Sequence, residues 1–84
     1  MNDKPIAVVA GVGSGTGEAL AKRFAEGGYR VAMIARKAER LERIAGEIPE
    51  ASAYPCDMSD IETFRATLIR IKNELGPIKI AIHN

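Results

Sequence analysis

The sequence has little of what several classes of protein require. Its 84 residues include one cysteine, Cys56, and one histidine, His83. A single cysteine cannot form a disulfide within the chain, so a disulfide framework is excluded and a reducing, cytoplasmic compartment is expected. No histidine lies near Cys56 in the sequence to activate it, and we interpret its side chain as a small buried group near a strand end. His83 is interpreted as an ordinary residue at a strand end, and no cluster of metal ligands is present.

Charge of one sign and long apolar runs are also lacking. Twelve basic and eleven acidic residues give a formal net charge of +1, without the basic surplus typical of nucleic-acid-binding domains. Basic and acidic residues alternate over residues 36–43 (RKAERLER), which is typical of a solvated helix face. No apolar run approaches the ~18 residues that cross a bilayer, and the N-terminal residues lack the apolar segment of a secretory signal. Nucleic-acid and membrane partners are therefore not expected.

The sequence does contain a regular alternation of short apolar runs and amphipathic segments. An apolar run bounded by proline and glycine, such as Ile6–Ala10, is typical of a strand buried on both faces. Apolar residues three or four apart predict helices instead. The predicted strands are Ile6–Ala10, Tyr29–Ala35, Ala51–Tyr54 and Ile78–His83; the predicted helices are Gly17–Glu26, ended by Gly27-Gly28, Ala38–Gly46, and a third that runs from a Ser59–Glu62 capping box through Ile61, Phe64, Leu68, Ile71 and Leu75 to Gly76.

Strands that alternate with helices predict an α/β fold. Strands and helices in the order β-α-β-α-β-α-β, connected by short loops, form a parallel sheet with right-handed crossovers and with helices on both of its faces. A chain of 84 residues suffices for one domain with a small core, since a domain of this size hides only about 60% of the surface of its unfolded chain. We expect residues 1–84 to form a single unit.

A glycine-rich loop connects the first predicted strand to the first predicted helix. Residues 11–17 (GVGSGTG) allow a sharp reversal, close approach of the backbone to a pyrophosphate, and tight helix packing. The N-terminus of the following helix offers unpaired N–H groups and a positive dipole end to an anion. A merely flexible loop is the alternative, which the position between a buried strand and an amphipathic helix disfavours. The candidate dinucleotide-binding residues of the loop are Gly11, Ser14, Gly15, Thr16 and Gly17.

Three motifs together resemble the short-chain dehydrogenase/reductase family. The spacing G-x-x-x-G-x-G is similar to that of the family's glycine loop and differs from the G-x-G-x-x-G of many other dehydrogenases. The pair Asp57-Met58 follows the third predicted strand, where the family has an acidic and a hydrophobic residue. Asn84 follows the fourth, where the family has an Asn-Ala-Gly motif. The three occur in the family's order and cover the whole chain.

The resemblance implies particular roles for the residues of these motifs. The side chain of Asp57 and the backbone of Met58 would hold the adenine, and Asn84 would belong to the cofactor site. Two positions depart from the family pattern: Ala10 stands where threonine is usual, and Thr16 where isoleucine or leucine is usual. At both positions the family uses mainly backbone groups. The departures affect at most a supporting hydrogen bond and the packing near the nicotinamide.

The end of the second predicted strand bears on the choice between NAD and NADP. An acidic residue there binds the adenosine ribose hydroxyls of NAD and repels a 2′-phosphate, whereas a basic residue does the reverse. This chain has Ala35 at the acidic position, followed by Arg36 and Lys37, and thereby resembles NADP-preferring members. Arg36 can bind a phosphate through its planar fork, with Lys37 as a weaker candidate and Ser14 as a further hydroxyl. The alternative is that Arg36 merely opens a charged helix.

The resemblance implies an oxidoreductase that transfers hydride between NADP(H) and a carbonyl or alcohol substrate. Family enzymes use a tyrosine with a lysine four residues later, and a serine. Tyr29 and Tyr54 are followed at that spacing by Met33 and Met58, so both are interpreted as packing residues. We therefore predict no catalytic residue in this chain and no activity from it alone.

Two other functions share features with this sequence. One is a non-catalytic module that binds NADP, which the sequence fits equally well. The other is a methyltransferase dependent on S-adenosylmethionine, which also has a glycine-rich first loop but generally has an acid where Arg36 stands.

In the Rossmann-type doubly wound sheet that the resemblance implies, the strand order is 3-2-1-4 and the chain is truncated after the fourth strand. The strand Ile78–His83 then lies at an edge, and an uncovered apolar edge pairs readily with another chain. We expect a homo-oligomer, poor stability, or a fragment of a longer protein.

Overall fold

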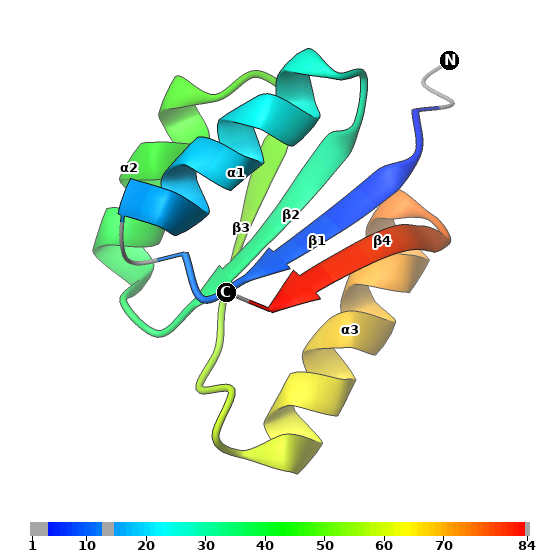
Figure 1. Ribbon diagram of the computed structural model, residues 1–84. Coiled ribbons are helices and arrows are strands. Elements are labelled where there is room, and N and C mark those ends of the chain that lie inside the picture. The colour runs from blue at the N-terminus through cyan, green and yellow to red at the C-terminus, as the bar shows by residue number, and fades with distance from the viewer. Residues whose placement is uncertain (1–3, 13–14, 84) are drawn as a thin grey trace.

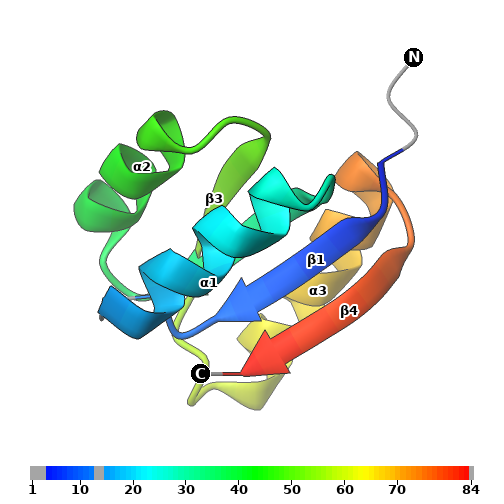
Figure 2. The same cartoon turned by 45° about the horizontal axis from the view of Figure 1, so that its top comes forward.

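A four-stranded parallel sheet forms the middle layer of the computed structural model, which describes residues 4–12 and 15–83. The strands β1 to β4 and helices α1 to α3 alternate along the chain: β1 (Ile6–Ala10), α1 (Gly15–Glu26), β2 (Arg30–Ala35), α2 (Ala38–Glu47), β3 (Ala51–Pro55), α3 (Ile61–Leu75) and β4 (Ile78–His83). The sheet order is β3-β2-β1-β4 and every pair is parallel. Helices α1 and α2 cover one face and α3 the other (Figures 1 and 2). The predicted α/β fold with strand order 3-2-1-4 is confirmed.

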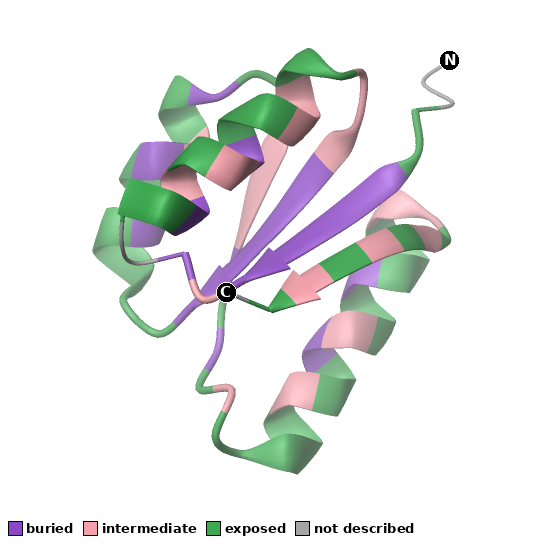
Figure 3. Ribbon diagram, viewed as in Figure 1, coloured by how far each residue is buried: buried purple, intermediate pink, exposed green. Residues whose placement is uncertain are grey.

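The two central strands form the core, because helices cover both of their faces. All five residues of β1 and five of the six in β2 are buried (Figure 3). Successive side chains point to opposite faces of a strand. Val9 and Met33 therefore pack with Leu41 on the α1–α2 side, whereas Val8 and Ile34 pack with Ile71 on the α3 side. The prediction that Ile6–Ala10 is buried on both faces is confirmed.

Several element boundaries differ from those predicted. Helix α1 begins at Gly15, two residues early, and ends as predicted before Gly27-Gly28, where Gly28 has φ 96°. Strand β2 begins at Arg30 instead of Tyr29, because the Tyr29 N–H donates to Phe24 O at the end of α1. Strand β3 extends to Pro55.

The end predicted for α2 at Gly46 is wrong. The helix continues through Glu47, and the N–H of Ile48 still bonds to Ala45 O. Ile48 is buried in the core, and the chain reaches Pro49, which lacks a backbone N–H, only after it. A buried anchor followed by proline ends this helix, and Gly46 lies within it.

The capping box predicted for α3 is also wrong. Asp60 is the N-cap, and its carboxylate accepts the Thr63 N–H at 3.2 Å. Both the N–H and the hydroxyl of Ser59 donate instead to the Asp57 carboxylate, at 3.0 and 2.7 Å. Ile61 does not join the apolar face of α3, since 70% of it is exposed. The later members of that face, Phe64, Leu68, Ile71 and Leu75, do pack against the sheet.

The tyrosines and the cysteine are packing residues, as predicted. The Tyr54 hydroxyl donates to the Glu74 carboxylate at 2.8 Å, and the Arg70 guanidinium lies 5.3 Å from the Tyr54 ring centre. Burial, followed by this hydrogen bond, raises the pKa of Tyr54 to about 12. Tyr29 contacts Phe24 edge to face, and Cys56 is buried. The three therefore stabilise the contacts between sheet and helices.

No described helix combines the length and the apolar character that a membrane span needs.

Candidate functional site

The sequence-predicted binding residues that the structure describes lie at one edge of the sheet. All four strands run in the same direction, so their carboxyl ends lie together (Figure 2). The loop after β1 leads into α1, and the turn after β2 leads into α2, at this same edge. The strand order reverses between β1 and β4, and ligands of open α/β sheets bind outside the carboxyl ends of the strands at such a point. This edge is the candidate site.

The glycine loop begins with two hydrogen bonds to the neighbouring strand. The N–H groups of Gly11 and Val12 both donate to Ile34 O, at 2.8 and 3.1 Å. Gly11 has φ 88°, a left-handed conformation that is costly for a residue with a β-carbon. Val12 is buried and fixes the loop to the core. Gly13 and Ser14 lie outside the described residues, so the structure does not place the predicted Ser14 hydroxyl.

The three predicted residues at the start of α1 differ in their surroundings. Gly15 and Thr16 are exposed, whereas Gly17 is buried. A β-carbon built at Gly15 would meet no atom of the described residues within 4 Å. The fold itself therefore does not require glycine at position 15, and open space lies beside the N-terminus of the helix. Such space is where a phosphate group could approach the unpaired N–H groups.

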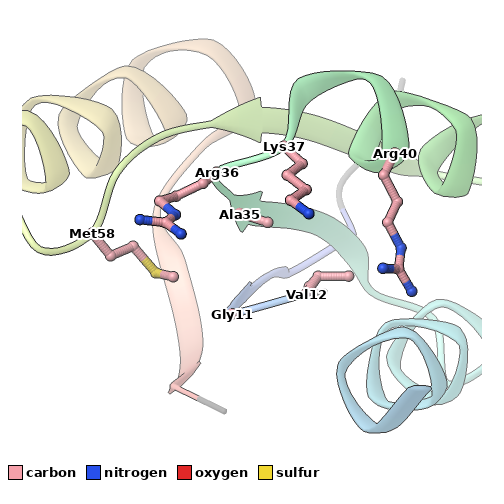
Figure 4. A pocket seen from close by; sticks show the side chains of 7 residues that line it. All are labelled: Gly11, Val12, Ala35, Arg36, Lys37, Arg40 and Met58. Atoms are coloured by element: carbon pink, nitrogen blue, oxygen red, sulfur yellow. The ribbon is translucent and has the colours of Figure 1, made fainter. Parts of the chain in front are cut away.

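A cavity of about 270 Å³ lies beside the glycine loop. It brings together four sequence-predicted residues from three separate segments, and Figure 4 shows how their side chains lie. The residues that line it are Gly11, Val12, Ala35, Arg36, Lys37, Arg40 and Met58. Sequence reasoning missed Arg40, which it assigned to a solvated helix face. Its position three residues after Lys37 on the same helix was the available signal, since residues three apart share a helix face.

The charged groups that the described residues contribute to the cavity wall are all cationic. Arg36, Lys37 and Arg40 line it without an aspartate or glutamate among the lining residues. Within residues 4–12 and 15–83, no carboxylate forms an ion pair with any of the three; the pairs that form there use Lys4, Lys22, Arg30 and Arg70. The cavity therefore has the charge expected of a site for a phosphate or another anion.

The start of α2 adds to this positive potential. Lys37 is the N-cap residue, and its side chain accepts no backbone hydrogen bond. Helix N-termini carry partial positive charge, so acidic residues are favoured there and basic residues are disfavoured by about 0.3–1 kcal/mol each. Only Glu39 in the first turn follows that preference. Basic residues at a helix N-terminus go against this preference, and such an exception beside a cavity indicates a functional site.

Asp57 adjoins the cavity but is not among the residues that line it. Its carboxylate accepts both hydrogen bonds from Ser59. These bonds, with a smaller contribution from the charge of Arg36, lower the pKa of Asp57. The neighbouring Met58 does line the cavity. Of the predicted pair, Met58 thus lines the cavity, and the carboxylate of the preceding Asp57 is oriented by Ser59.

Asn84 lies outside the described residues, but its neighbour is placed. His83 is the last residue of β4 and is paired in register with Ala10, directly before the glycine loop. His83 is exposed. Among the described residues, no three histidine, cysteine, aspartate or glutamate side chains are grouped to hold a metal ion.

Comparisons with known proteins agree with this geometry. A family model described as short chain dehydrogenase matches residues 5–84. An uncharacterized oxidoreductase of Mycobacterium bovis is 35% identical over 94% of this chain, which covers 25% of that protein. The chain thus spans about a quarter of the length of this curated relative.

Solved structures share the fold over nearly the whole chain. An actinorhodin polyketide ketoreductase crystallised with NADPH has a TM-score of 0.93 at 28% identity, over 100% of this chain and 34% of its own. A 3-ketoacyl-(acyl-carrier-protein) reductase from Brucella melitensis, in complex with NADH, has a TM-score of 0.84 at 36% identity, over 92% of this chain and 32% of its own.

Proposed function

The chain belongs to the short-chain dehydrogenase family, and from this premise we propose that residues 1–84 are the N-terminal, dinucleotide-binding part of an NADP-dependent oxidoreductase. The complete protein would transfer hydride between NADP(H) and a carbonyl or alcohol substrate. The observation that carries the choice of NADP is the cavity with Arg36, Lys37 and Arg40 in its wall, beside the glycine loop. Its charge fits a phosphorylated adenosine ribose.

The residues of this chain divide the binding between them. The backbone at Gly11 and the open N-terminus of α1 at Gly15 to Gly17 would hold the diphosphate. Arg36 and Lys37 would bind the ribose phosphate, and Asp57 with Met58 would flank the adenine. Ser14 and Asn84 complete the proposed set. When bound, the nicotinamide ring supplies or accepts the hydride.

The preference for NADP is argued from the end of β2. Of the two solved relatives above, one contains NADPH and the other NADH, so family membership leaves the choice open. Ala35 has no carboxylate with which to accept hydrogen bonds from ribose hydroxyls, and Arg36 follows it at the cavity wall. A guanidinium donates charge-assisted hydrogen bonds to phosphate in a planar fork. NAD lacks this phosphate and would therefore gain less from that group.

Proton transfer would depend on residues outside the 84 of this chain. Neither of its tyrosines has a lysine four residues later. A general acid or base works best with a pKa near the working pH, whereas the pKa of Tyr54 is raised to about 12. We propose that these residues alone bind the cofactor without turning it over.

We also propose that the protein is cytoplasmic, since Cys56 is unpaired and buried, and that it forms homo-oligomers.

The NADP assignment is tested by Arg36→Ala. Loss of one charged hydrogen bond, about 1.5–3 kcal/mol, should weaken NADPH binding about ten- to a hundred-fold and leave NADH binding nearly unchanged. Both affinities are measured by titration of nicotinamide fluorescence. Arg43→Ala is the matched control, because Arg43 is exposed on α2 and does not line the cavity. Equal losses for the two cofactors would refute the assignment.

A non-catalytic NADP-binding module is the second candidate, which the cationic cavity beside the glycine loop would serve equally well. Oxidation of NADPH by the full-length natural protein with a panel of carbonyl compounds separates the two. Turnover supports the oxidoreductase, and binding without turnover supports the module.

A further inference from the structure

We infer that Arg40 is a specificity-determining residue of the proposed NADP site, where it binds the adenosine ribose phosphate from the side opposite Arg36. This inference rests on the proposed function and extends it to a residue on a different element. Arg36 follows the end of β2, whereas Arg40 belongs to the first turn of α2. Both line the same cavity.

The arrangement of the cavity wall places three cations around one space. Figure 4 shows Arg36 beside Met58, Arg40 on the other side of the cavity, and Lys37 between them. The side chains of Lys37 and Arg40 both extend from the start of α2 toward the side on which Gly11 and Val12 lie. An anion in this space would be reached from β2 and from α2 at once.

The packing of α2 explains why Arg40 faces this way. Leu41 and Ile44 are buried against the sheet and fix the rotation of the helix about its axis. Lys37 and Arg40 are three residues apart and therefore share a face. With Leu41 held in the core, that face meets the glycine loop at the carboxyl edge of the sheet. Arg43 follows by another three residues but does not line the cavity.

The electrostatics of the helix start favour an anion there. Arg36, Lys37 and Arg40 crowd around the positive end of α2, and within the described part of the chain no acidic side chain pairs with them. Like charges so placed repel one another and the helix dipole. A doubly charged phosphate would relieve this repulsion, which a ribose with free hydroxyls would not. Arg40 should thus discriminate between the two cofactors.

The test uses the small probes 2′,5′-ADP and 5′-AMP, which differ by the 2′-phosphate alone, together with NADPH. Arg40→Gln should weaken binding of 2′,5′-ADP and NADPH about three- to twenty-fold and that of 5′-AMP by less than about twofold. Arg40→Lys keeps the charge and should restore part of the loss. The matched control is Arg43→Gln, which removes the same charge from the next turn of α2. Affinities are measured by calorimetry, with thermal unfolding as a check that each variant is folded.

Each outcome decides between the inference and its premise. If Arg40→Gln behaves as Arg43→Gln does, or weakens 2′,5′-ADP and 5′-AMP alike, the inference is overturned, while a selective loss in Arg36→Ala would leave the NADP assignment standing. If the unmodified protein binds 2′,5′-ADP no better than 5′-AMP, the NADP assignment itself fails. A selective loss in both Arg36 and Arg40 variants supports both.

Discussion

Two glycines of the same loop occupy their positions for different physical reasons. Gly11 has φ 88°, so its backbone conformation by itself favours glycine. Gly15 begins α1, and within the part of the chain that the structure describes a β-carbon there would meet no atom within 4 Å. Its lack of a side chain gives the folded chain no steric advantage. Glycine would be an advantage there if the proposed diphosphate occupies the open space.

Gly15→Ala should therefore separate stability from binding. Alanine is favoured over glycine in a helix by up to about 1 kcal/mol, so the melting temperature should stay the same or rise. NADPH affinity should fall about tenfold or more, because the added methyl group would obstruct the approach of the diphosphate to the helix. Thermal unfolding and fluorescence titration measure the two effects. Unchanged NADPH affinity would contradict the proposed position of the diphosphate.

The corresponding change at Gly11 is the control. Gly11→Ala places a β-carbon on a residue with φ 88°, which costs about 1–2 kcal/mol. It should lower the melting temperature even without cofactor. Opposite effects on stability at two positions of one loop would show that only one of the glycines serves the fold.

At the scale of elements, two neighbouring polar residues at the start of α3, Ser59 and Asp60, have different roles. The Asp60 carboxylate caps the helix at Thr63, while Ser59 donates its N–H and its hydroxyl to Asp57. Cap residues stabilise a helix by bonding an N–H that would otherwise lack a partner. Ser59 organises the loop that carries Met58 to the cavity rim, and Asp60 alone organises the helix.

Replacement of these two residues should reveal the division. Asp60→Ala should lower the free energy of unfolding by about 1 kcal/mol, the usual effect of losing an N-cap. Ser59→Ala should lower it by less, because the Ser59 N–H can still donate to Asp57 and only the hydroxyl bond is lost, so no N–H of the helix loses its partner. Urea denaturation measures the two free energies. The cap assignment would be wrong if Ser59→Ala proved the more destabilising change.

The sequence predicted the elements better than their ends. Buried runs such as Ile6–Ala10 are stable only in a sheet that is covered on both faces, so the strands could be predicted from the pattern. Their order was implied by the resemblance to the family. The N-cap residue of α3 could not be predicted from the pattern, because serine and aspartate are both good cap residues. Ser59 bonds to Asp57 instead, and only the structure shows this. The predicted end of α2 at Gly46 was wrong for a related reason. Ile48 is buried in the core, and the helix continues beyond Gly46 toward it.

The candidate site shows the same division between pattern and packing. Gly11, Arg36, Lys37 and Met58 follow strand ends, and parallel strands bring such residues to one cavity. Arg40 stands in an alternating charged segment whose pattern is that of any solvated helix. Only the rotation of α2, fixed by Leu41 in the core, turns Arg40 toward the cavity.

For the molecule as a whole, the two edges of the sheet and its uncovered surfaces set its behaviour in solution. Strand β4 pairs with β1 and, among the described residues, with no other strand. Its three isoleucines are only half-buried, and they alternate with the exposed residues Lys79, Ala81 and His83. A strand edge of this kind presents unpaired N–H and C=O groups to another chain. Lys79 is the one lysine, arginine, aspartate or glutamate of β4, and its charge opposes such pairing.

We therefore expect the 84-residue chain to associate as its concentration rises, through β4. Ala81→Lys adds a second charge to the exposed row of this strand and should weaken association about fivefold or more, since like charges brought together across paired strands repel. Ala66→Lys makes the same change on the exposed side of α3 and should leave association unchanged. Sedimentation velocity over a range of concentrations measures all three chains. A monomer at every concentration, or equal effects of the two lysines, would show that β4 is not the surface through which copies meet.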